Sequence, residues 1–172
     1  MAYKSTMIAP PDVESRNDSY PVFEPGGYYY NPKTGKSYRY VKVVGGTPTV
    51  GACAYWSSFG NSAGSTFTCV TAAAASSGGF TGTTMDVAGV WTTAASSGNW
   101  TFIQTGGTCL LTYGSASIGK GNQLVSNGNA SNASGGTFTG VAPGTAITTR
   151  LVGFALQDKN ASNKGYATLL LE

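Results

Sequence analysis

The sequence predicts an all-β protein, a single small barrel or sandwich of short strands with Gly/Ser-rich loops and an extended N-terminal arm. Charged residues make up only 10% of the 172 residues, whereas helical proteins normally carry many Lys and Glu side chains on their exposed faces. Strands need less charge, because Thr, Ser and Asn serve as their outward polar residues. The apolar residues also come in short runs separated by Gly-bearing turns, which is typical of barrels and sandwiches.

The first element is an arm over residues 1–26, ahead of a β-rich domain over residues 27–172. The arm holds four of the seven prolines, several charges and no apolar periodicity. Ordering its backbone costs about 1 kcal/mol or more per residue, and its few apolar side chains bury little surface in return. We therefore expect the arm to be loose in solution or laid against a partner.

A β-hairpin follows in "GYYYNPKTGKSYRYVKVV", with its turn at Asn31–Gly35 and its second strand over Tyr38–Val44. Side chains alternate along a strand, so the tyrosines and lysines of this strand point one way. Arg39 and the valines point the other way. This pattern predicts an ordinary half-buried hairpin with one mixed face and one apolar face.

Seven further short strands are predicted along the chain. They lie in "TPTVGACAYW", "TFTCV", "VAGVW", "NWTFIQ", "TCLLTY", "AITTRLVGFALQ" and "GYATLLLE". Residues 57–82 are expected to form a Gly/Ser-rich loop insertion. One helical turn, over 72–76, is the only helix that we expect.

Enzyme chemistry finds little support in the residue types. The chain has no histidine, which excludes Ser-His-Asp and Cys-His pairs and histidine metal sites. Outside the arm and the last residue, Asp86 and Asp158 are the only carboxylates, and neither has the context of a glycosidase pair. We therefore expect no catalytic residue, no cofactor and no metal. Cys53, Cys69 and Cys109 are expected to be small buried hydrophobes of a protein made in a reducing cytosol.

One stretch, "GSASIGKGNQLV", resembles part of a phosphate-binding loop, with Gly119-Lys120 following Gly114 after four residues. A true loop of this kind needs Ser or Thr after the Lys and a helix behind it. Gly121 occupies the Ser/Thr position, and the turn-rich sequence that follows cannot be a helix. The stretch is therefore predicted to be a Gly-rich turn between strands.

Binding to nucleic acid or to a membrane is also disfavoured. The hairpin mixes Lys and Arg with Tyr, as single-strand binding sites do, but the net charge is only +3. No apolar run reaches the length of a membrane span, and no secretory signal is expected at the N-terminus. The run Tyr28-Tyr29-Tyr30 is either a protein contact or packing within the sheet, and both interpretations stay open.

Three segments, taken in order, resemble one known family. In "GKSYRYVKVVGGTPTVGACAYW" a glycine precedes an aromatic-Arg-Tyr-Val strand and a second Gly-led strand. In "VAGVWTTAASSGNWTFIQTGGTCLL" an Ala-Gly-Val leads to an aromatic and a Gln. In "SIGKGNQLV" and "LVGFALQDKNASNKGYATLLLE" a Gly-led element precedes the closing strands. These segments resemble the head decoration, or capsid cement, proteins of tailed bacteriophages, which usually carry Gly-Asp where this chain has Gly121-Asn122. The likeness covers most of residues 35–172, leaving the arm and residues 57–82 unmatched.

The resemblance implies a virion structural protein, assembled in the host cytoplasm, that sits on the outer surface of the phage capsid. There it would bridge subunits of the major capsid protein and stabilise the lattice, often as a homo-trimer. The candidate capsid or subunit contacts are Tyr28, Tyr29, Tyr30, Arg39 and Tyr40, together with the arm. The candidate structural turn glycines, which permit positive φ, are Gly35, Gly89, Gly119, Gly121 and Gly153.

An alternative function is a host-receptor or glycan-binding module of a phage fibre or spike. Exposed Trp56, Trp91 and Trp100 would support this alternative, because aromatic rings pack against sugars. Tryptophans buried in the core would not.

Overall fold

A computed structural model describes residues 7–58, 68–70, 87–114, 117–126, 138–145 and 151–171. Over these residues the regular structure is all β, without a helix, which confirms the predicted fold class. The helical turn expected over 72–76 and most of the expected 57–82 insertion lie outside the described residues. The strands are β1 (Met7–Ile8), β2 (Tyr28–Asn31), β3 (Lys36–Val44), β4 (Cys53–Ser58), β5 (Thr68–Val70), β6 (Val87–Trp91), β7 (Trp100–Thr112), β8 (Gln123–Ser126), β9 (Phe138–Val141), β10 (Leu151–Ala155) and β11 (Lys164–Leu170).

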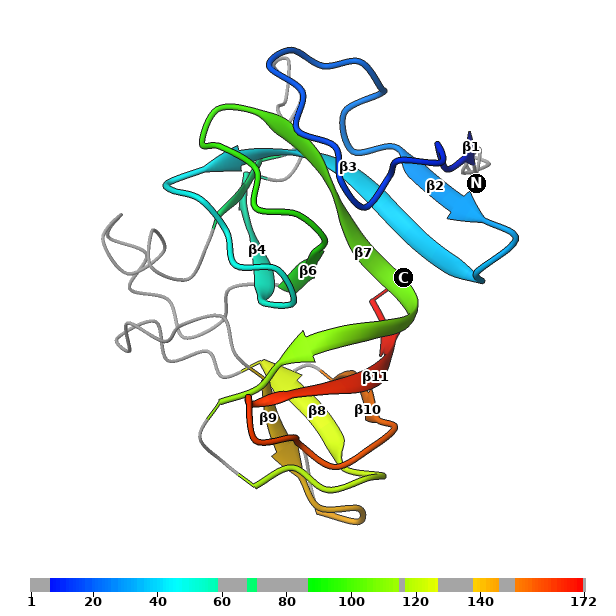
Figure 1. The fold of residues 1–172 in the computed structure, drawn as a ribbon, viewed down its shortest axis with the longest axis vertical. Coiled ribbons are helices and arrows are strands. Elements are labelled where there is room, and N and C mark those ends of the chain that lie inside the picture. The colour runs from blue at the N-terminus through cyan, green and yellow to red at the C-terminus, as the bar shows by residue number, and fades with distance from the viewer. Residues whose placement is uncertain are drawn as a thin grey trace.

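The upper part of the molecule is a closed five-stranded barrel (Figure 1). Its strands follow the order β3-β5-β4-β6-β7, and β7 closes the ring by pairing with β3. Within the barrel only the β3–β5 pair is parallel. Closure leaves these strands no free hydrogen-bonding edge, which is the usual way in which small β proteins avoid edge-to-edge association.

Strand β7 belongs to both parts of the molecule. Its first half pairs with β3 and β6 in the barrel, and its second half pairs with β11. The two strands expected in "NWTFIQ" and "TCLLTY" are therefore one, so the prediction of a turn between them was wrong. Gly107, at φ +80°, bends the strand without ending it, and an added Cβ would lie 2.6 Å from the Gly35 carbonyl oxygen.

The lower part is an antiparallel sheet that continues from β7 through β11, β10 and β8 to β9 (Figure 1). The strand expected in "AITTRLVGFALQ" is β10, and the closing strand is β11. Strand β9 was not anticipated, because its Phe and Val lie among turn residues and give no alternating pattern.

The predicted hairpin is confirmed. Strands β2 and β3 are antiparallel, with Tyr28 opposite Arg39 and Asn31 opposite Lys36. The turn is closed by the Gly35 N–H, which donates to the Asn31 carbonyl oxygen at 2.9 Å. Gly35 has φ +67°, a conformation that glycine adopts without steric cost.

Three groups of buried side chains form the core. One includes Val41, Cys69 and Ile103 on the barrel strands, and a second includes Leu111 and Leu124 around the lower sheet. The third is an aromatic cluster between the hairpin and the arm, which is described below. All three cysteines are buried and free of disulfides, and burial raises the pKa of each thiol, that of Cys109 to about 12. They occupy core positions, as the sequence predicted.

The described part of the arm, residues 7–26, packs on the chain's own barrel. Val13 is buried against the hairpin, and β1 pairs in parallel with β2. Asp18 and Trp100 exchange two backbone hydrogen bonds of 2.9 and 2.7 Å. The expectation of an arm that is loose or held by a partner was wrong for these residues. That expectation considered only the apolar side chains of the arm itself. It left out the aromatic surface of the hairpin, which the arm covers.

Candidate protein-binding surface

The outer face of the lower sheet is unusually apolar. Along β7 and β11, side chains alternate between the core and the outside, and Leu110 stands opposite Tyr166 in the register. Phe154 of β10 stands opposite Thr168 on the same side, and the Leu156 N–H donates to the Tyr166 carbonyl oxygen. We call this surface the apolar face, and its members are Leu110, Phe154, Leu156, Tyr166 and Leu170.

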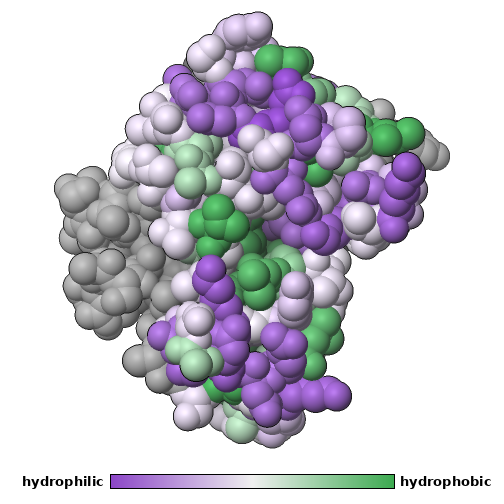
Figure 2. All heavy atoms as spheres, viewed as in Figure 1, coloured by the Kyte–Doolittle hydropathy of each residue, from purple (hydrophilic) through white to green (hydrophobic). Residues whose placement is uncertain are grey.

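Each of these five side chains is between 37% and 50% exposed. Their strand neighbours Cys109, Leu111, Ala167 and Leu169 point the other way and are buried in the core. Figure 2 shows apolar residues gathered on the viewed side where the barrel meets the lower sheet. Contiguous exposed apolar patches are characteristic of surfaces that take part in protein or ligand binding.

The five residues predicted as contacts divide into buried and accessible ones. Tyr29 and Tyr40 lie in the aromatic cluster beneath the arm, which also contains Tyr38, Trp100 and Phe102. Tyr30 is 40% exposed and Tyr28 is half-buried. Only Tyr28 and Tyr30 are therefore accessible to a partner without rearrangement of this chain.

Arg39, the remaining predicted contact, is only 8% exposed. Its guanidinium carbon lies 3.9 Å from the Tyr28 ring centroid and 5.3 Å from that of Trp56. Burial lowers the pKa of Arg39 from its usual value, and stacking on the two rings compensates for part of the lost hydration. Arg39 thus holds the hairpin to β4. The alternation of side-chain directions along the strand did not indicate this role within the chain.

Acidic side chains fasten the arm over the tyrosines of β3. The Tyr38 hydroxyl and the Lys36 ammonium both donate to Glu14 Oε1, each at 2.6 Å. The Tyr40 hydroxyl donates to Asp18 Oδ2 at 2.7 Å. Burial and these bonds raise the pKa of Tyr38 and Tyr40. On the face of β3 that was predicted to be mixed, the tyrosines are therefore buried, whereas Lys36 and Lys42 stay half-buried.

The stretch around Gly119-Lys120 is a turn, as predicted. The Lys120 N–H donates to Asp158 Oδ1 at 2.7 Å, and the Gly119 N–H donates to Asn122 Oδ1 at 2.9 Å. The Gly121 N–H donates to the Ala155 carbonyl oxygen at 2.8 Å. These three backbone donors are bound within the chain and are not free to hold a phosphate.

Two of the five predicted turn glycines have positive φ, Gly35 and Gly121. Gly119 immediately precedes the second of these turns. Gly89 and Gly153 lie inside β6 and β10, where lack of a side chain serves close approach between strands. An added Cβ would meet the Gln104 carbonyl oxygen at Gly89 and the Thr168 carbonyl oxygen at Gly153. Glycine is required at these two positions because there is no room for a side chain, and not because of the backbone conformation.

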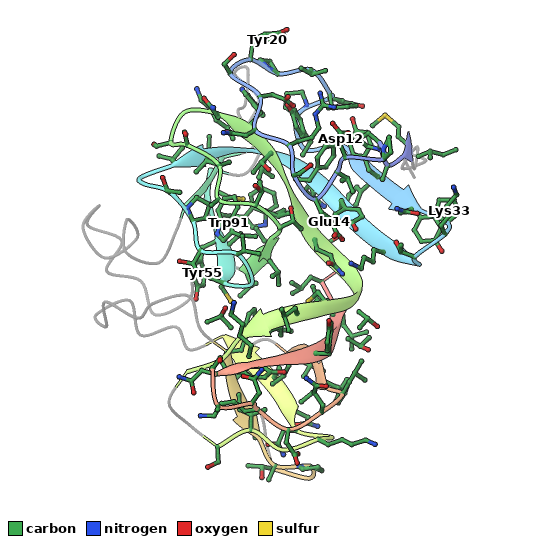
Figure 3. The ribbon with its side chains drawn as sticks, in the orientation of Figure 1. Asp12, Glu14, Tyr20, Lys33, Tyr55 and Trp91 are labelled. Atoms are coloured by element: carbon green, nitrogen blue, oxygen red, sulfur yellow. The ribbon has the colours of Figure 1, made fainter. Side chains whose placement is uncertain are left out.

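A cavity of about 350 Å³ opens beside the apolar face. Leu110 and Tyr166 belong both to its wall and to the apolar face, and the arm contributes Glu14. Trp91, from β6, also lines the cavity (Figure 3). Trp91 and Trp100 are buried in the core, and Trp56 is half-buried against it.

Within the part of the chain that the structure describes, no group of three or more His, Cys, Asp or Glu residues could hold a metal ion. The same residues form no helix that could cross a membrane. Comparisons of the chain with protein-family models, with curated proteins and with solved structures found no match.

Proposed function

We propose that the protein is a non-enzymatic structural protein of a bacteriophage virion. It binds the outside of the capsid lattice and stabilises it by bridging subunits of the major capsid protein. The observation that carries the proposal is the apolar face, with four large side chains exposed on neighbouring strands and a fifth, Leu156, directly after β10. The resemblance of the sequence to phage head decoration proteins supports the major capsid protein as the partner.

The chemistry of the surface suits a protein partner. The apolar face carries Thr168 between its apolar members, and its described charged neighbours are Lys164 at one end of β11 and the Glu14–Lys36 ion pair in the wall of the adjoining cavity. A surface with so little charge can be buried against protein without leaving charges unpaired. The chain as a whole has only 10% charged residues, so the same argument extends beyond this face.

Trimer formation is part of the proposal. Three linked copies that each make a modest contact bind a lattice with far higher avidity than one copy does, because the second and third contacts form at a high effective concentration. A homo-trimer on the head would thereby hold several major capsid subunits together.

The test is co-sedimentation of the purified protein with phage heads that lack it. We expect Leu110→Arg and Tyr166→Asp to weaken binding at least tenfold, because each places a charge in the buried contact. The matched control is Val44→Arg, at a residue of β3 with similar exposure, 37% against 42% for Leu110. Binding of the Leu110 and Tyr166 variants at the wild-type level would reject the apolar face as the capsid contact.

The glycan-binding alternative gains no support from the tryptophans. Trp91 and Trp100 are buried, and Trp56 packs against the core beside Arg39. Neither buried ring can stack on a sugar, and Trp56 is half-buried, with the Arg39 guanidinium over its ring.

A further inference from the structure

Lysines border the apolar face at the lower end of the molecule. Lys164 is the first residue of β11, and it lies on the same side of the strand as Tyr166 and Leu170, because alternate side chains of a strand point the same way. Lys164 is exposed, whereas the next residue, Gly165, is buried. The outer side of β11 therefore begins with a cation and continues with mainly apolar side chains.

Hydrogen bonds bring two more lysines to this end. The loop that joins β10 to β11 is bound to the turn that precedes β8. The Lys159 N–H donates to the Ile118 carbonyl oxygen at 3.0 Å, and the Lys120 N–H donates to Asp158 Oδ1 at 2.7 Å. The same loop ends at Lys164, and both segments lie at the lower end of the molecule (Figure 1). We call Lys120, Lys159 and Lys164 the lysine rim.

The lysine rim brings more positive than negative charge to this border. Within residues 117–126 and 151–171, the three lysines stand against a single carboxylate, that of Asp158. Lys120 and Lys164 are exposed, and neither forms an ion pair with a residue that the structure describes. The charges of these two lysines are therefore available to a partner.

The other charged neighbours of the apolar face are already paired with each other. Lys36 Nζ and Glu14 Oε1, in the wall of the adjoining cavity, are 2.6 Å apart. A partner that covers the interior of the apolar face therefore leaves no described charge without a counter-charge. A partner that also covers the lower border removes hydration from Lys164, and this loss is compensated only if the partner supplies carboxylates there.

The apolar face decides between two classes of anionic partner. A nucleic acid could pair its phosphates with the lysine rim, but its charged backbone would gain nothing from Leu110, Phe154 and Tyr166 beside them. A protein contact surface combines an apolar centre with a polar border. The arrangement of lysines and apolar side chains therefore favours a protein.

We propose that the lysine rim pairs with carboxylates along one border of the surface that the partner protein presents to the apolar face. This inference rests on the proposed function and specifies the chemistry of the partner. The apolar side chains are exposed on several strands and fix no direction, whereas the lysines lie at one end only. The partner therefore docks in one orientation, with its acidic border toward the lower end of the molecule. Charges at the border of a contact act mainly on the rate of association and on its dependence on salt.

The first experiment measures the rate at which the protein associates with phage heads that lack it, at about 50 mM and about 500 mM NaCl. Lys120→Glu and Lys164→Glu should each slow association at least about threefold at the lower salt. The effect should be much smaller at the higher salt, which screens exposed charges. Both side chains are exposed, so the variants should fold, and circular dichroism checks that they do.

Lys33→Glu is the matched control. It makes the same change of charge at an exposed lysine in the turn of the hairpin, away from the lower end (Figure 3). Its association rate should equal that of the wild type at both salt concentrations. Equal slowing by Lys33→Glu would mean that only net charge matters and would overturn the inference.

The second experiment is carbodiimide cross-linking of decorated heads, because this reagent joins an amine to a carboxylate only where the two are in direct contact. Mass spectrometry should find cross-links from the lysine rim to Asp or Glu residues of a capsid subunit, and none from Lys33. Absence of such cross-links from all three lysines of the rim overturns the inference, whatever the association rates are.

The outcomes distinguish this inference from the proposed function. Head binding that Leu110→Arg weakens, but that salt and both lysine substitutions leave unchanged, overturns the acidic border and keeps the function. Slower association of the lysine variants together with the expected cross-links supports both. A wild-type protein that does not bind heads at either salt concentration overturns the function and the inference with it.

Discussion

At the scale of single residues, the glycines inside strands are the most exacting positions. Gly153 of β10 lies so close to β11 that an added Cβ would overlap the Thr168 carbonyl oxygen. We expect Gly153→Ala to lower the free energy of unfolding by about 3 kcal/mol, because backbone must move to relieve the overlap. Urea denaturation measures the change.

Gly119→Ala is the matched control for this substitution. The nearest atom to a Cβ at Gly119 lies 3.7 Å away, on Asp158, so the free energy of unfolding should change by less than about 0.5 kcal/mol. Equal losses of unfolding free energy in Gly153→Ala and Gly119→Ala would contradict this explanation. It states that Gly153 is required because there is no room for a side chain, whereas neither space nor φ requires glycine at position 119.

Phe23 shows how much one arm residue contributes. Its ring makes edge contacts with the rings of Tyr29, Tyr40 and Phe102, at centroid distances of 5.7, 5.3 and 5.3 Å. The Arg16 guanidinium carbon also lies over the Phe23 ring, 4.9 Å from its centroid. Phe23→Ala should destabilise the protein by about 2 kcal/mol, less than a fully buried Phe.

Thermal unfolding is the measurement for Phe23→Ala, with Tyr20→Ala as its control. Tyr20 is 68% exposed at the outer tip of the arm (Figure 3), so its removal should leave the melting temperature nearly unchanged. A Phe23→Ala protein as stable as the wild type would show that the arm does not hold the aromatic cluster.

Sequence reasoning at this scale succeeded where one residue decides the local structure. Gly35 and Gly121 were placed in turns because only glycine adopts their φ readily. It failed for Arg39 and Tyr40, which look like surface residues by type. Their burial depends on Trp56 and on the arm, which are distant in the sequence, and no local pattern encodes such contacts.

At the scale of elements, the arm is held partly by an ionised carboxylate. Burial alone would raise the pKa of Glu14, but hydrogen bonds from Lys36 and Tyr38 and the charge of Lys36 outweigh it and lower the pKa. The contribution of Glu14 to stability is therefore complete above its unfolded pKa of about 4.5. It is lost as the pH falls through the lower folded value.

We therefore expect the wild-type protein to lose stability between about pH 4.5 and pH 3 more steeply than Glu14→Gln does. The difference should be small, because Glu14 is half-exposed and solvent screens its ion pair. Urea unfolding at pH 7 and at pH 3 measures it. Identical pH dependence in the two proteins would show that Glu14 does not fasten the arm.

Element boundaries were predicted well where turn chemistry is explicit and poorly where it is ambiguous. Asn31–Gly35 is a clear turn signal and ends β2 correctly. Gly106-Gly107 looks equally turn-like, yet both residues lie inside β7. The difference is set by tertiary pairing, because β3 and β11 bind the two halves of β7 on either side of the bend.

At the scale of the whole molecule, we expect the barrel and the lower sheet to unfold together, because β7 is hydrogen-bonded in both. Loss of either part would leave half of β7 without its partner strands. Tryptophan fluorescence reports the barrel, since Trp56, Trp91 and Trp100 all lie on its strands, and far-UV circular dichroism reports every strand. The two urea transitions should coincide. Midpoints that differ by more than the experimental error would show two independent units.

The fold class could be predicted from composition and turn spacing, but the candidate surface could not. Leu110 and Tyr166 occupy strands that pair with each other across more than 50 residues of sequence, and Phe154 stands on the next strand, β10. Until the register is known, each is one more apolar strand residue with an equal chance of pointing inward. Only the order β7-β11-β10 brings them to one side of a sheet.

The continuity of β7 also has a mechanical consequence. A pull applied to the lower sheet passes along one unbroken backbone into the barrel, where antiparallel neighbours grip that strand lengthwise. Their hydrogen bonds would then bear the load in shear, many at a time, and would not peel apart singly. A protein that bridges the subunits of a shell under internal pressure would resist expansion of that shell through this one strand.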